Sequence, residues 1–135
     1  MSNAASDFLE DKILDHVLGG AAYAAPGTVY LGLFTSDGGL ETNTAVSQTE
    51  VSTSGTAYAR EAITFGTASA GSISSSATVT FTAATANWGT VTHIALMDAA
   101  SAGNVLFWGA VTTAKTIETG DTFQVSSGNI TVSLD

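Results

Sequence analysis

Two histidines, His16 and His93, are the first candidates for catalytic or metal-binding chemistry in this chain. A catalytic histidine needs a nucleophile and an orienting carboxylate beside it. The sequence has no Gly-x-Ser-x-Gly turn, and its serines are too numerous for any one of them to stand out. Without cysteines, two histidines fall short of most zinc ligand sets unless a carboxylate joins them. We therefore expect both histidines to be structural or to lie at an interface.

Charged side chains offer a second kind of chemistry. Asp37 and Glu41 lie in residues 36–56, the longest stretch without a pattern, and they are candidate calcium ligands. Their spacing matches no EF-hand loop, so we expect a solvated loop there. Nothing in the sequence pairs two carboxylates for glycoside hydrolysis. Arg60 and Glu61 are neighbours in an expected strand and so lie on opposite faces, where each is expected to pair across strands or with another chain.

Aromatic residues suggest a third possibility, a platform for sugar binding. Tyr30, Tyr58, Trp88 and Trp108 are the candidates. Aromatic side chains in β-rich runs belong more often to the core, which is the reading we favour. The chain also has neither a Gly-x-Gly-x-x-Gly fingerprint nor a Walker loop. The sequence therefore assigns no catalytic, cofactor-binding or metal site to any residue.

The composition is typical of a part of an assembly. Charged residues make up 11% of the chain, against about 25% in ordinary soluble domains. The formal net charge is −9, and the three cations, Lys12, Arg60 and Lys115, are scattered. Nucleic-acid binding requires a basic patch, which this pattern does not provide. No apolar run approaches the roughly 20 residues needed to span a bilayer. We therefore expect neither a nucleic acid nor a membrane as partner.

The order of elements predicts a mainly β fold with one N-terminal helix. The helix is expected at 7–18, with Asp7 as its N-cap and Glu10 three residues later. Short alternating runs separated by Gly- and Ser-rich turns predict a β-sandwich or jelly-roll-like domain of about seven strands. We expect a single domain over 1–135, with the sandwich at 28–135. The expected strands are 28–34, 58–65, 77–82, 122–126 and 129–135, together with a hairpin within 88–113.

The helix carries one apolar stripe. It is formed by Leu9, Ile13 and Val17, with Leu14 and Leu18 beside them. We expect this stripe to pack on the sheet. The alternative is that it docks on a neighbouring subunit.

The hairpin is expected to be the centre of the core. In its second strand, residues 105–108 are apolar without a break, which predicts that both faces are covered. Phe107 and Trp108 should therefore lie in the core or at a subunit interface. In the first strand, alternation places Thr92, Ile94 and Leu96 on one face and Val91, His93, Ala95 and Met97 on the other.

Several stretches, in this order and spacing, resemble a known family. They are FLEDKILDHV at 8–17, APGTVYLGLFTS at 25–36, YAREAITF at 58–65, WGTVTHIAL at 88–96, GDTF at 120–123 and ITVSLD at 130–135. Together they resemble small structural proteins of tailed phages, often labelled phage tail fibre protein and similar to decoration or cement proteins of the phage head. The resemblance covers nearly the whole chain. It implies a β-sandwich virion component without enzymatic activity or cofactor, and it carries over no binding residues.

From this resemblance we expect a capsid decoration protein that binds the major capsid protein. A tail or tail-fibre-associated protein is the alternative in the same class, and a carbohydrate-binding adhesion module is the alternative from another class. The protein would be made in the host cytoplasm and lie on the phage particle surface. Low charge content and strand edges that need covering favour a homo-oligomer. Analogy with decoration proteins favours a trimer.

Overall fold

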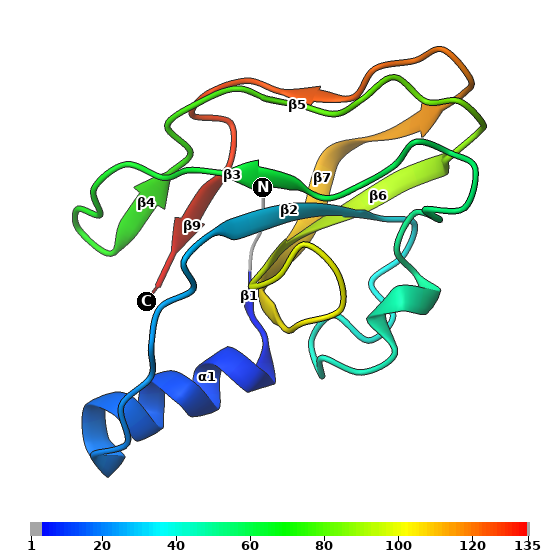
Figure 1. The fold of residues 1–135 in the computed structure, drawn as a ribbon. Helices are drawn as coiled ribbons and strands as arrows, with labels where there is room; N and C mark the ends of the chain where they lie inside the picture. The colour runs from blue at the N-terminus through cyan, green and yellow to red at the C-terminus, as the bar shows by residue number, and fades with distance from the viewer. Residues whose placement is uncertain (1–3, 135) are drawn as a thin grey trace.

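The computed structural model describes residues 4–134, so residues 1–3 and 135 of the expected domain lie outside the described part. Its strands form a five-stranded antiparallel sheet in the order β1-β7-β6-β2-β3 and two further pairs, β4–β9 and β5–β8 (Figure 1). This confirms a mainly β, sandwich-like fold with an N-terminal helix. The strands are β1 Ala4–Ala5, β2 Val29–Phe34, β3 Glu61–Ile63, β4 Ser72–Ser74, β5 Val79–Thr80, β6 Gly89–Met97, β7 Val105–Ile117, β8 Gln124–Val125 and β9 Thr131–Ser133.

The expected hairpin, β6 and β7, lies at the centre of the large sheet, and β7 runs four residues further than its pattern predicts. The pairing between β6 and β7 shifts register between Val91 and His93. A bulge of this kind turns the side chains that precede it. Val91 therefore joins Ile94 and Leu96 in one buried cluster, and its expected place on the opposite face is wrong.

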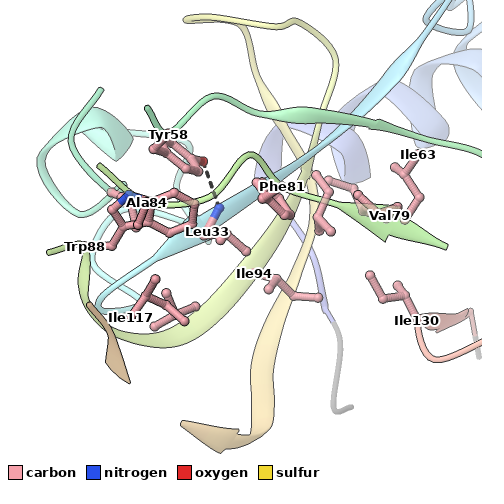
Figure 2. Close-up of a cluster of buried hydrophobic side chains, with 14 of the residues drawn as sticks. Leu33, Tyr58, Ile63, Val79, Phe81, Ala84, Trp88, Ile94, Ile117 and Ile130 are labelled. Atoms are coloured by element: carbon pink, nitrogen blue, oxygen red, sulfur yellow. Dashed lines mark hydrogen bonds between the residues drawn. The ribbon is translucent and has the colours of Figure 1, made fainter. Parts of the chain in front are cut away.

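The larger hydrophobic cluster fills the space between this sheet and the two strand pairs. Leu31, Leu33 and Ile94 come from the sheet, and Val79 and Phe81 come from the layer above it (Figure 2). Val79 and Phe81 are 5% and 1% exposed, so the alternation of residues 77–82 predicts their burial correctly. Ile130 and Val132, from the end of the chain, complete the layer.

A second cluster covers the opposite face of the sheet. Phe34, Met97 and Val105 pack there against Leu40, which comes from the long loop and is fully buried. More than half of residues 36–56 is exposed, so the expected solvated loop is confirmed for most of its length, while the burial of Leu40 and Val51 shows that the loop also packs on the sheet. Its return is fixed by backbone hydrogen bonds from Thr35 to Thr49 at 2.8 Å and from Val51 to Leu33 at 3.0 Å. Val105 and Leu106 are buried, and Phe107 and Trp108 are half-buried against the larger and the smaller cluster, so the two faces of 105–108 are covered in part.

The helix begins where the sequence predicts, but its cap and its packing differ. Helix α1 spans Asp7–Leu14 and continues as a π-helical turn, η1, Asp15–Gly19. Ser6, not Asp7, is the N-cap, because the Leu9 N–H donates to the Ser6 Oγ at 3.3 Å. Leu9 is the buried residue of the helix, and the helix beyond it extends away from the sheets (Figure 1). The later residues of the stripe, Leu14, Val17 and Leu18, are therefore exposed. The expectation that the whole stripe packs on the sheet is therefore wrong.

Candidate functional site

The two histidines make separate structural contacts. His16 lies in the exposed π turn, where its Nδ1 accepts a hydrogen bond from the Tyr23 N–H at 3.0 Å. His93 is half-buried in β6, with its Nδ1 2.8 Å from the Thr92 hydroxyl and its ring 6.1 Å from that of Trp108. Within residues 4–134, no three histidine or acidic side chains gather in a way that could hold a metal ion. Neither histidine has a carboxylate beside it among the hydrogen bonds described.

The two candidate calcium ligands, Asp37 and Glu41, make different contacts. Asp37 is exposed in the turn that opens the loop, where its carbonyl accepts from the Leu40 N–H at 3.1 Å. Glu41 is engaged on both sides: its Oε2 accepts from the Trp108 Nε1–H at 2.8 Å, and its carbonyl accepts from the Asp7 N–H at 2.9 Å. Glu41 thus ties the helix start and β7 to the loop.

The most organised charged group of the chain is the pair Arg60 and Glu50. The Arg60 Nε donates to the Glu50 Oε1 at 2.7 Å, and its Nη2 donates to Oε2 at 2.8 Å. The two side chains are only 4% and 11% exposed. Arg60 Nη1 also donates to the carbonyls of Ala99 and Ala102, in the turn between β6 and β7, at 2.9 and 2.7 Å. Arg60 pairs as predicted, although its partner Glu50 lies in the long loop and not in a neighbouring strand. Glu61 lies half-buried in β3 opposite Leu31, and its own pairing stays a prediction.

Tyr58 extends this group toward the core. Its hydroxyl donates to the Glu50 Oε1 at 2.8 Å and accepts from the Leu33 N–H at 2.9 Å (Figure 2). Burial, followed by the negative charge of Glu50, raises the pKa of Tyr58. Burial alone would lower the pKa of Arg60, but the hydrogen bond and charge of Glu50 raise it above its usual range. Tyr58 therefore keeps its proton and Arg60 its charge near neutral pH, and the group of Glu50, Tyr58 and Arg60, here called the clamp, ties the long loop to the core and to the β6–β7 turn.

The turn joined by this clamp has its own polar network. The Asp98 carboxylate accepts from the backbone N–H of Asn104 at 2.6 Å and from its side-chain amide at 2.9 Å. The Asn104 Oδ1 accepts from the Asn43 amide at 2.9 Å. Gly103 has φ +71°, and a Cβ at this position would collide with Asp98. The long loop is thereby fixed to both sides of the β6–β7 turn, and sequence spacing offered no signal for these contacts.

We expect Tyr58→Phe to flatten the alkaline end of the stability curve. Unfolded Tyr58 loses its proton near its usual pKa of 10.0, whereas the folded protein holds it. Stability from this group is therefore complete below pH 10 and falls above it, by up to about 1.4 kcal/mol per pH unit. Urea denaturation of both proteins between about pH 8 and pH 11 measures this difference. Parallel curves for the two proteins would contradict it.

The aromatic residues do not form an exposed platform. Trp88 and Tyr58 are 5% and 3% exposed, with rings 5.4 Å apart in the large cluster. The Trp88 Nε1–H donates to the Thr56 carbonyl at 2.8 Å. Tyr30 and Trp108 are half-buried against the smaller cluster. Burial makes the ring faces of Trp88 and Tyr58 inaccessible to a sugar, while Tyr30 and Trp108 stay partly exposed.

Comparison with known proteins places the chain in a family. The family model described as Podophage GP4 fiber I protein gp80 matches residues 4–133. The chain belongs to this family of podophage fibre proteins. No curated protein matches it. The match spans nearly every described residue, from β1 through the clamp to the last strand, so it covers the whole fold and not one motif.

Membership in a podophage fibre family makes the protein a structural component of the virion, as the sequence resemblance implies. A place on the head, as a capsid decoration protein, is not confirmed, and the tail-fibre alternative agrees better with the family. In residues 4–134, no helix has the length and apolar character to cross a membrane.

Proposed function

We propose that this protein is a non-enzymatic structural component of a podophage tail fibre, made in the host cytoplasm and built into the surface of the particle. The observation that carries the proposal is the family match across residues 4–133. Its partners are then other proteins of the virion. The fold agrees with this role because its charged and aromatic groups serve to hold loops and strands together.

A phage from which this gene is deleted distinguishes the fibre role from a head role. Fibre loss should reduce adsorption to host cells while the heads keep their DNA and their resistance to heat. A plasmid copy of the wild-type gene, supplied during growth, should restore adsorption and serves as the control. Normal adsorption by particles whose heads leak DNA would contradict the fibre proposal and support capsid decoration.

A further inference from the structure

Two apolar features of the described part of the chain have no partner within it. The first is the end of the helix, here called the tip, formed by Leu14, Val17 and Leu18. These side chains are 56%, 68% and 79% exposed. Leaving three large apolar side chains together in water is unfavourable relative to burying them. Such a patch marks a surface that meets another molecule.

The second feature is an apolar groove between the large sheet and the β4–β9 pair. It has a volume of about 320 Å³, and no charged residue lines it. Leu134 stands at its rim and is 54% exposed. The three residues of the tip and Leu134 are the large apolar side chains exposed in residues 4–134. The lining includes Val29, Phe65, Ile73, Leu96, Phe107 and Val132.

The tip is held away from the groove of its own chain. No residue of the helix lines the groove. After the helix, the connector folds back along it, and the Ala21 N–H donates to the Asp15 carbonyl at 3.0 Å. Tyr23 then contacts His16 by a hydrogen bond and Phe8 through ring edges, with centroids 6.4 Å apart. The tip and the groove therefore cannot close on one another without undoing these contacts.

We propose that the tip of one copy of this chain inserts into the groove of a second copy. A cavity of about 150 Å³ accepts a benzene-sized group, so a groove of about 320 Å³ accommodates two leucine-sized side chains. The groove offers no charge to a polar ligand, and the tip offers apolar side chains without a partner. Both halves of the contact lie on one chain, so copies of this chain alone can form it.

The contact joins two different patches, so it forms a reciprocal pair or a ring where the geometry closes, and an open filament where it does not. A standard interface buries about 800 Å² on each partner, a little over a tenth of the 6999 Å² surface of this chain. A closed assembly uses the tip and the groove of every copy, so each copy contributes both surfaces to the buried area. This inference does not depend on where the protein lies in the virion.

Charge sets how the association should respond to salt. The chain has 12 acidic and three basic residues, and Asp11 and Asp15 flank the tip. Repulsion between copies is screened over about 8 Å at physiological ionic strength and over shorter distances at higher salt. Added sodium chloride should therefore strengthen the association. A contact held by ion pairs would weaken instead.

Two single substitutions test the two halves of the contact. Leu18→Ser changes the tip, and Ala68→Glu places a charge in the groove, where Ala68 is an exposed lining residue. Thr67→Glu is the matched control, because it adds the same charge at the exposed neighbouring position, which does not line the groove. All three positions are exposed, so at a protein concentration low enough for every protein to be monomeric, the melting temperature should stay at the wild-type value. Equal melting temperatures show that any loss of association is not loss of folding.

Sedimentation equilibrium of the purified full chain gives the result. Wild type and Thr67→Glu should associate with equal affinity, while Leu18→Ser and Ala68→Glu should each raise the dissociation constant by at least about tenfold. A mixture of the two variants should associate again, since one supplies the tip and the other the groove. A monomeric wild type, or association unchanged in both variants, would overturn the proposal. The proposal would also be overturned if the purified protein is monomeric and Leu18→Ser prevents only its incorporation into particles. The tip would then bind another virion protein.

Discussion

Replacing Arg60 with alanine is expected to lower the free energy of unfolding by about 3–5 kcal/mol, because it leaves a buried carboxylate without its partner. Glu50 is 11% exposed and receives two hydrogen bonds from the guanidinium. The same substitution frees the carbonyls of Ala99 and Ala102. The β6–β7 turn should therefore loosen together with the long loop. Urea denaturation followed by circular dichroism measures the loss.

A double variant separates two costs of Arg60→Ala: the unpaired carboxylate of Glu50 and the lost contacts of the arginine side chain. Arg60→Met with Glu50→Gln removes both charges and keeps an oxygen that can accept from Tyr58. We expect this protein to be more stable than Arg60→Ala alone, since no unpaired charge is buried in it. If the double variant is the less stable of the two, the cost lies in packing and not in the unpaired carboxylate.

Trp88→Ala is expected to cost a similar amount, about 3–5 kcal/mol. Trp88 is 5% exposed and packs edge-on against Tyr58 and Phe81, at ring distances of 5.4 and 6.3 Å. Alanine would leave a cavity at the centre of the aromatic group of the large cluster. Guanidinium denaturation followed by far-ultraviolet circular dichroism is suitable, because removing a tryptophan alters the fluorescence signal itself.

Two further substitutions calibrate this result. Trp88→Phe retains a ring but removes one of the two hydrogen bonds that the Thr56 carbonyl accepts, the other coming from the Thr85 N–H, at a cost of about 0.5–1.5 kcal/mol. Trp108→Ala should cost less than Trp88→Ala, because Trp108 is half-buried beside the smaller cluster. Equal losses for Trp88→Ala and Trp88→Phe would show that ring packing contributes little, which would contradict the account of the core.

Alternation and turn residues predict the main elements because they depend on neighbours in the sequence. The run from Val29 to Phe34 separates into two faces that meet two different clusters. The hairpin is recognisable from its apolar strands and its Gly103–Asn104 turn. By contrast, β4 consists of Ser-Ile-Ser, and its pairing with β9 across nearly 60 residues leaves no local pattern. The bulge after Val91 likewise depends on the partner strand.

The contacts that organise the candidate site are less predictable for the same reason. Arg60 stands out as a lone cation, but its partner Glu50 lies in a loop whose sequence has no period. Leu40 is buried although its neighbours are small and polar. In the helix, by contrast, the local pattern is clear: its periodicity correctly predicts an apolar stripe. The periodicity does not show which surface covers Leu14, Val17 and Leu18.

Electron cryo-microscopy of the intact phage particle tests the fibre assignment most directly. The fold has recognisable features for such a map: a five-stranded sheet, two strand pairs and a helix that extends away from them (Figure 1). We predict that density matching residues 4–134 lies in the fibres of the tail. Density for this fold in the lattice of the head, with none in the tail, would contradict the proposed function.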